Sequence, residues 1–189
     1  HMDPEGMMGK ASPDQIRSVW FGWLENLVSF HKINYEDLEL SMIDKRSNES
    51  SHLQSDLQYY KSFMEWGMDG EANAFLEEVL LWLSENLPLN PNPKKLCWGD
   101  SRLGNVLFEN FRVKSLLDWE MATIGDPLCD LAWGLTTDDV SSYGLNIEKL
   151  PGSIANEEAI KFWEKNTGYS AENFFYYRIL CLSLIHISE

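Results

Sequence analysis

The sequence predicts an α+β fold that is mostly helical, with a small β-hairpin in the second half of the chain. Apolar residues recur at helical spacing over several long stretches. The 8 Trp, 7 Tyr and 9 Phe residues favour a core of bulky rings packed between helices. Short apolar runs separated by turns lie between Lys95 and Leu117. The length of 189 residues and the 44% hydrophobic content suit one domain with one substantial core.

The first predicted helix begins after Ser12 and ends near His31. Ser12 can cap it, Pro13 suits its first position, and Gln15 can complete a capping box. We assign its apolar face to the core; the residues on this face are Ile16, Val19, Trp20, Trp23, Leu24 and Leu27.

The polar stretch 44–51 predicts a solvated loop, because it has nothing to bury. Two helices are expected after it, with Gly67 and Gly70 between them. Their apolar positions are Leu53, Leu57, Tyr60 and Met64 in the first helix and Phe75, Val79, Leu80 and Leu83 in the second. Helical structure then ends at Pro88, Pro91 and Pro93.

The next stretch predicts strands. A short apolar run reaches Trp98, and after a polar loop the runs 106–108 and 113–117 flank a turn at Glu109-Asn110, which predicts a hairpin. Asp126 and Pro127 then favour a helix start, with Leu128, Leu131, Ala132 and Leu135 on its buried side.

Two final helices are expected to open near Asn156 and Ser170, where acidic residues suit a helix N-terminus. Gly168 between them suits a left-handed C-terminal cap.

The formal net charge of −15 argues against a nucleic-acid or anionic membrane surface as a partner, because like charges repel. It favours a neutral or cationic partner. No apolar run approaches the roughly 20 residues that a membrane-spanning helix needs. Cys97, Cys129 and Cys181 are odd in number and far apart, which favours a reducing cytoplasm without structural disulfides.

The ends of the chain carry separate expectations. His1-Met2 is interpreted as a cloning remnant, residues 1–11 as a disordered lead-in, and residues 12–189 as the single domain. The last residues end inside a predicted helix, so we expect a truncation there as well.

The chemistry is concentrated in the segment 98–105 and in Asp118. A carboxylate, a cation and an amide (Asp100, Arg102 and Asn105) share one short loop between two extended runs, and Asp118 ends the predicted hairpin. Phosphoryl transfer needs such groups: a carboxylate that orients the attacking hydroxyl, and oxygen ligands for magnesium on the phosphates.

Three motifs resemble those of the aminoglycoside phosphotransferase and choline kinase superfamily. Trp98-Gly99-Asp100 through Asn105 is similar to its H-G-D-x-x-x-x-N catalytic loop, and Leu117 through Glu120 to its metal-binding D-F/W-E segment. Gly125 through Ala132 matches its G-D-P-x-x-D-L-A helix entry. In particular, the motifs resemble those of the phosphotransferase domain that is fused to some acyl-CoA dehydrogenases.

The resemblance implies a protein-kinase-like C-terminal lobe that phosphorylates a hydroxyl on a small molecule with ATP and Mg²⁺. Asp100 would be the catalytic base, Asn105 a magnesium ligand, and Asp118 the main magnesium ligand that bridges the nucleotide phosphates. Taken one at a time, Asp100 and Asn105 could equally make side-chain turns and Asp118 could simply end a strand.

Neighbouring residues receive supporting roles. Arg102 could stabilise charge on the transferred phosphoryl group or be a surface arginine. Glu120 could assist the metal, but we favour a bond to adjoining backbone. Asp126 and Asp130 are expected to organise the site, Asp126 as a helix cap and Asp130 by reaching back to amides of the catalytic loop. Trp119 and Trp133 are expected to pack beneath that loop.

The chain departs from the family pattern in two ways. Trp98 stands where the family has histidine, which puts the geometry of the loop in doubt more than the identity of the base. The N-terminal lobe, with its phosphate-covering loop and lysine, cannot be located, since Gly6, Gly9 and Lys10 have no strand around them. We therefore expect weak or no activity alone; the alternative is a non-catalytic, kinase-like binding module or an inactive fragment.

Other sites are less well supported. His31, His52 and His186 show no metal-ligand spacing and are interpreted as solvated or capping residues. Ser101 lacks the flanking glycines of a hydrolase nucleophile. The acceptor could be an aminoglycoside, another polycation or a hydroxylated metabolite, and the surface left by the missing lobe could support a homo-oligomer.

Overall fold

The computed structural model describes residues 8–44, 52–67 and 73–188, and helices dominate this part of the chain. The α-helices are α1 (Pro13–His31), α2 (His52–Gly67), α3 (Ala74–Glu85), α4 (Leu128–Ser142), α5 (Asn156–Thr167) and α6 (Phe174–Ser188). The mostly helical α+β fold predicted from the sequence is confirmed. None of the described helices is long and apolar enough to cross a membrane.

The strands form two small antiparallel pairs. Strand β1 (Lys95–Cys97) pairs with β4 (Thr123–Gly125), and β2 (Val106–Glu109) pairs with β3 (Arg112–Leu116) as a hairpin. The β1–β4 pair was not predicted, because a three-residue strand carries almost no periodic signal in the sequence.

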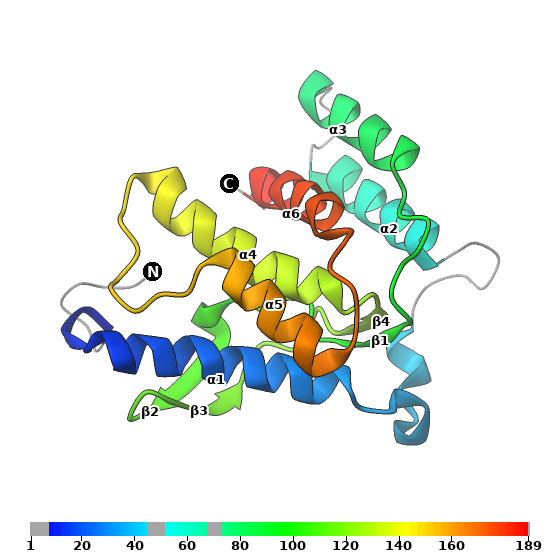
Figure 1. Cartoon of the computed structure of the whole chain (residues 1–189). Coiled ribbons are helices and arrows are strands. Elements are labelled where there is room, and N and C mark those ends of the chain that lie inside the picture. Colours follow the sequence, from blue (N-terminus) through cyan, green and yellow to red (C-terminus); the bar gives the residue numbers. More distant parts are fainter. Residues whose placement is uncertain (1–7, 45–51, 68–72, 189) are drawn as a thin grey trace.

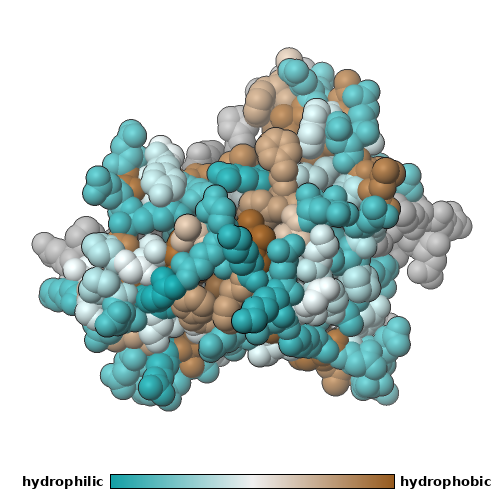
Figure 2. Space-filling view, in the orientation of Figure 1, coloured by the Kyte–Doolittle hydropathy of each residue, from teal (hydrophilic) through white to brown (hydrophobic). Residues whose placement is uncertain are grey.

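Helix α4 occupies the centre of the molecule (Figure 1). It packs against α6, which also contacts α2 and α3, while α1 packs against α5 and against the hairpin strand β3. The loop 98–105 is hydrogen-bonded to two helices that are remote in sequence, to α1 through Trp23 and to α4 through Asp130. Figure 2 shows that polar residues cover most of the visible face, with hydrophobic patches between them.

Large aromatic side chains build the core around α1. Trp20, Trp23, Trp98 and Trp163 are at most 1% exposed, and the Trp20 and Trp23 rings meet edge to face with centroids 5.7 Å apart. All six residues predicted for the buried face of α1 are buried. The N-terminus of α1 is also as predicted, since Ser12 and Gln15 form a complete capping box.

Several details differ from the sequence-based expectations. The hairpin turn is at Asn110-Phe111, one residue beyond the predicted Glu109-Asn110, and both turn residues have positive φ (51° and 60°). This backbone twist matches the twist of the flanking strands. Met8–Lys10 form a short 3-10 helix whose Met8 packs against the core, although they were assigned to the lead-in. Residues 45–51 and Gly70 lie outside the described part.

Gly134 sets how closely α4 approaches its neighbours. A Cβ atom there would lie 2.2 Å from the Trp23 ring and 2.9 Å from the Ser101 carbonyl oxygen. Trp23 Nε1 donates to that same carbonyl at 2.7 Å, so the ring cannot retreat without losing its hydrogen bond.

We expect Gly134→Ala to lower the free energy of unfolding by about 1–3 kcal/mol, the usual cost of overpacking a tight core. Gly144→Ala is the matched control, because its Cβ would meet Val140 Cγ1 at an ordinary 3.7 Å. Denaturant unfolding measures both. Equal stabilities of the two variants would mean that the α1–α4 contact is looser than described here.

Candidate active site

The carboxylate of Asp130 fixes the start of the catalytic loop. Asp130 lies in the first turn of α4 and is 1% exposed. Its Oδ2 atom accepts the backbone N–H of Trp98 at 2.7 Å, and its Oδ1 atom accepts that of Gly99 at 2.8 Å. Gly99 has φ of +90°, and a Cβ there would lie 2.4 Å from the Met121 carbonyl oxygen. The expected contact of Asp130 with catalytic-loop amides is therefore present.

His31 completes this anchor from the other side. Its Nε2 atom lies 3.1 Å from Asp130 Oδ2, and its Nδ1 atom lies 3.1 Å from Trp163 Nε1. An indole N–H can only donate, so Nδ1 must accept and the ring proton is on Nε2. The imidazole therefore donates to the Asp130 carboxylate.

The prediction that His31 is solvated or capping is wrong, because the residue is fully buried. Its partners are 99 and 132 residues away in sequence, so spacing could not reveal them. One signal was available: His31 follows Leu27 by four positions and so continues the apolar face of α1. The side chains of His52 and His186 lie outside the described part.

Asp100 is the buried carboxylate of the loop, and donors reach both of its oxygens. Trp133 Nε1 donates to Oδ1 at 2.7 Å and Asn105 Nδ2 donates to Oδ2 at 2.7 Å. Arg102 Nε lies 3.1 Å from Oδ2, and its side chain is half exposed. Trp133 packs against the core as expected, but its hydrogen bond to Asp100 was not predicted.

Asn105 ends the short 3-10 turn Leu103–Asn105, and its amide orientation is fixed by Asp100. Besides the carboxylate, its Nδ2 atom reaches the Asp100 carbonyl oxygen at 3.0 Å. Among the described residues no donor reaches Asn105 Oδ1. This oxygen therefore stays available as a ligand.

Asp118 is positioned through the residue before it. Leu117 N donates to the Asn105 carbonyl oxygen at 2.8 Å, and Leu117 O accepts Trp98 Nε1 at 2.8 Å. Asp118 itself has φ of +61°, a conformation that costs free energy outside glycine and persists only when neighbours hold it. Hydrogen bonds thus connect Asp100, Asn105 and the backbone before Asp118. The Asp118 carboxylate is exposed and has no hydrogen bond with the described residues.

Trp98, at the position where the resemblance implies histidine, is part of this connection. It is 0% exposed and lies against Phe30 and Trp119, with ring centroids 6.5 and 5.7 Å away. Its backbone bonds to Asp130 and its indole to Leu117. With tryptophan at this position, the loop therefore keeps hydrogen bonds both to Asp130 and to Leu117.

Asp126 holds the approach to α4. Its Oδ1 atom accepts Leu128 N at 2.9 Å, and its Oδ2 atom accepts Asn92 N at 3.0 Å and the Tyr177 hydroxyl at 2.9 Å. Burial, and next the Asp126 charge, raise the pKa of Tyr177 well above its ordinary value, so the phenol remains a donor. Asp126 thus joins α4, α6 and the segment before β1.

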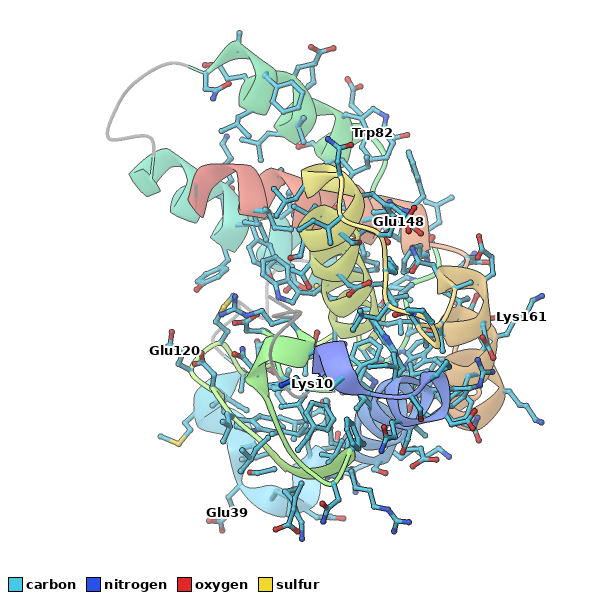
Figure 3. All side chains as sticks on the ribbon, turned by 90° about the vertical axis from the view of Figure 1, so that its left-hand side faces the viewer. Lys10, Glu39, Trp82, Glu120, Glu148 and Lys161 are labelled. Carbon is cyan, nitrogen blue, oxygen red and sulfur yellow. The ribbon has the colours of Figure 1, made fainter. Side chains whose placement is uncertain are left out.

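Glu120 lies in the exposed turn after Asp118, on the opposite side of the molecule from Lys161 of α5 (Figure 3). The backbone contact expected for Glu120 is not among the hydrogen bonds of the described residues. Large hydrophobic side chains in and beside this turn are also exposed; they are Leu117, Trp119 and Met121. The homo-oligomer predicted from the sequence, through the surface left by the missing lobe, stays a prediction.

The described residues contain no group of three or more His, Cys, Asp or Glu that could hold a metal ion by themselves. Asn105 Oδ1 and the Asp118 carboxylate remain as two hard oxygen ligands on hydrogen-bonded neighbours. Magnesium is commonly held in this way, by one or two carboxylate-type ligands together with substrate phosphates and water. Both oxygens are of the type that magnesium prefers.

Comparison with known proteins assigns the family. The family described as "Phosphotransferase enzyme family" matches residues 2–163, which is most of the chain. The chain belongs to the phosphotransferase enzyme family.

Similar curated proteins are much longer than this phosphotransferase chain. "Acyl-CoA dehydrogenase family member 11" of Pongo abelii is 28% identical over 182 residues, which are 87% of this chain and 22% of that protein. "Probable acyl-CoA dehydrogenase IBR3" of Arabidopsis thaliana is 26% identical over 139 residues, 70% of this chain and 16% of that protein. The chain thus spans about a fifth of the length of such relatives.

Solved structures show the same fold. A Ralstonia eutropha JMP134 protein, provisionally assigned as an aminoglycoside phosphotransferase, superposes with a TM-score of 0.80 at 19% identity, over 95% of this chain and 56% of that one. Macrolide 2'-phosphotransferase type I superposes with a TM-score of 0.66 at 14% identity, over 94% and 54%. The phosphotransferase chain thus spans about half the length of these structures.

We expect Asp130→Ala to lower the free energy of unfolding by about 3 kcal/mol or more. Two buried backbone amides lose their acceptor, and each such loss costs about 1–3 kcal/mol. Glu158→Ala is the control, since it breaks only the exposed Arg17–Glu158 pair, which is worth less than about 1 kcal/mol. Chemical denaturation measures both, and a small loss for Asp130→Ala would contradict its role as the anchor.

Proposed function

We propose that this chain transfers the γ-phosphoryl group of ATP, with Mg²⁺, to a hydroxyl group of a small molecule. One observation carries the proposal: the buried Asp100 carboxylate is hydrogen-bonded to Asn105, whose backbone is bonded in turn to the residue before Asp118. Membership of the phosphotransferase family supports the reaction class. Phosphoryl transfer depends mainly on positioning and charge stabilisation, which this arrangement supplies.

Asp100 is the proposed base. The acceptor oxygen forms a bond to the γ-phosphorus, and the bond from that phosphorus to the bridging oxygen breaks, with its electron pair leaving on ADP. The proton of the acceptor hydroxyl passes to the Asp100 carboxylate. Because Asp100 is held at both oxygens, it meets the hydroxyl in one orientation.

Asn105 and Asp118 are the proposed magnesium ligands. Asn105 offers Oδ1, since its Nδ2 is committed to Asp100, and Asp118 offers an exposed carboxylate. Magnesium in this position would neutralise charge on the nucleotide phosphates. Asp126 and Asp130 hold the loop and α4 in place, and Glu120 is near enough in sequence to orient Asp118 or its water ligands.

The Arg102 side chain is proposed to change its partner when substrate binds. In this structure it pairs with Asp100, but its side chain is 54% exposed, so the pair is weak and easily exchanged. A guanidinium that turns from Asp100 towards the transferred phosphoryl group would stabilise the charge there.

The acceptor is proposed as a small hydroxylated compound, and the net charge of −15 suits a cationic one. We also infer that the isolated chain turns over slowly. It covers 56% of a similar structure, and the resemblance implies a nucleotide-gripping lobe outside the described residues. A version of the protein extended to the length of the similar structures should transfer phosphate about 10²-fold faster or more, because the positioning of reactants contributes heavily to the activation barrier of phosphoryl transfer. No gain would favour a non-catalytic binding module.

We expect Asp118→Ala to abolish the rise in melting temperature that Mg²⁺ with ATP causes in the unaltered chain. A ligand that binds only the folded form must stabilise it, and the variant lacks the main metal ligand. Glu109→Ala is the matched control, because Glu109 is an exposed acid that pairs only with Lys114 among the described residues. Undiminished stabilisation of Asp118→Ala by Mg²⁺ with ATP would remove Asp118 from the site.

Asp100→Asn separates chemistry from binding. We expect it to keep the Mg²⁺-dependent stabilisation, since Asn105 and Asp118 are unchanged, and to lower phosphoryl transfer by about 10²- to 10⁴-fold. Release of labelled γ-phosphate measures the rate. A variant that transfers phosphate as fast as the unaltered chain would show that Asp100 is not the base.

A further inference from the structure

The indole of Trp133 makes a direct contact with the proposed base. Its Nε1 atom donates to Asp100 Oδ1 at 2.7 Å, while Asn105 Nδ2 donates to the other oxygen, Oδ2, at the same distance. Four other indoles of the described residues donate to other groups: those of Trp23, Trp98, Trp119 and Trp163 bond to Ser101 O, Leu117 O, Leu116 O and His31 Nδ1. Trp133 is the one whose partner is the reacting carboxylate.

Donors on both oxygens lock the plane of the carboxylate. A carboxylate bound at one oxygen resists rotation about its Cβ–Cγ bond with one hydrogen bond only. With Asn105 on Oδ2 and Trp133 on Oδ1, any such rotation breaks a hydrogen bond in a site where Asp100 is only 8% exposed. Breaking a buried hydrogen bond is costly, because water does not readily replace the donor.

The two oxygens are not equally available. An ionised carboxylate offers about four lone-pair positions, two on each oxygen. From the described residues Oδ2 receives two donors, Asn105 Nδ2 and Arg102 Nε, whereas Oδ1 receives only Trp133. The open position is therefore on Oδ1, beside the indole.

The helix that carries Trp133 is itself fixed to the catalytic loop. Asp130, three residues earlier, binds the Trp98 and Gly99 amides, and its carbonyl oxygen accepts the Ser101 hydroxyl. Gly134, the next residue, leaves no room for a Cβ atom, which would lie 2.2 Å from the Trp23 ring and 2.9 Å from the Ser101 carbonyl oxygen. A rigid helix therefore sets the position of the indole, and the loop cannot shift relative to it.

We propose that Trp133 is a positioning residue that locks the Asp100 carboxylate and leaves Oδ1 as the oxygen that receives the proton of the acceptor hydroxyl. This inference rests on the proposed function and adds to it the identity of the reacting oxygen. The acceptor oxygen bonds to the γ-phosphorus, ADP leaves with the bridging oxygen, and the proton goes to Oδ1. The carbon that bears the acceptor hydroxyl then lies next to the indole edge.

Trp133→Phe tests the inference, because it removes the N–H and keeps most of the ring. The assay is Mg²⁺-dependent hydrolysis of γ-labelled ATP by the 189-residue chain, with water as the acceptor. We expect kcat to fall about 10-fold or more, as for a misplaced catalytic group, while KM for ATP changes less than about 2-fold. A packing role alone would lower the melting temperature without this split between kcat and KM.

Trp82→Phe is the matched control. Trp82 lies on α3, well away from Glu120 of the site (Figure 3), and packs against Phe175 and Tyr176. It should leave kcat unchanged. If Trp133→Phe behaves like Trp82→Phe while Asp100→Asn is inactive, the inference on Trp133 is wrong and the proposed function stands. If the version extended to the length of the similar structures shows no Mg²⁺-dependent hydrolysis above its own Asp100→Asn variant, the proposed function fails and the inference fails with it.

A second measurement examines the contact without turnover. In ¹⁵N-labelled protein the indole N–H signal of Trp133 is the one that Trp133→Phe removes. Asp100→Asn should shift this signal far more than that of Trp82, because the charged acceptor is replaced by a neutral amide. An unmoved Trp133 signal would show that the indole does not bond to Asp100 in solution, and would overturn the proposal.

Discussion

The fold around the candidate active site depends on one buried carboxylate, which accepts hydrogen bonds from three N–H groups. Asp130 in α4 binds the amides of Trp98 and Gly99 and the imidazole of His31. A buried carboxylate is stable only when donors surround it, so α1, the catalytic loop and α4 must come together for the chain to bury this group. The same requirement places Asp100, one residue after Gly99, between α1 and α4 with its two oxygens within reach of donors from both loop and helix.

Indole N–H groups, which are neutral donors, connect the Asp130 anchor to the proposed reacting residues. Trp163 fixes the tautomer of His31, Trp98 joins the loop to the carbonyl before Asp118, and Trp133 holds Asp100. An indole N–H only donates and carries no charge, so it can orient a carboxylate or a carbonyl without adding a competing cation. Among the described residues the exposed Arg102 pairs with Asp100, and this weak pair leaves it able to exchange partners.

The sequence predicted the helices better than the contacts between them. Periodic apolar faces and capping residues are local signals, and they were sufficient for α1 and its capping box. Asp100, Asn105 and Asp118 could be proposed from the sequence because each belongs to a contiguous motif. His31 and the Trp133 hydrogen bond were missed, since each depends on a partner 33 or 99 residues away that only packing brings close. The backbone hydrogen bond expected for Glu120 is not among those of the described residues, because packing does not constrain an exposed acid in this turn.

The central claim is that Asp100, Asn105 and Asp118 surround one magnesium–phosphate position anchored by Asp130. A crystal structure of the chain with Mg²⁺ and a non-hydrolysable ATP analogue tests it most directly. We expect a metal ion coordinated by Asn105 Oδ1 and the Asp118 carboxylate, with the terminal phosphate facing Asp100. A metal and nucleotide bound elsewhere, with these oxygens turned to separate surroundings, would contradict it.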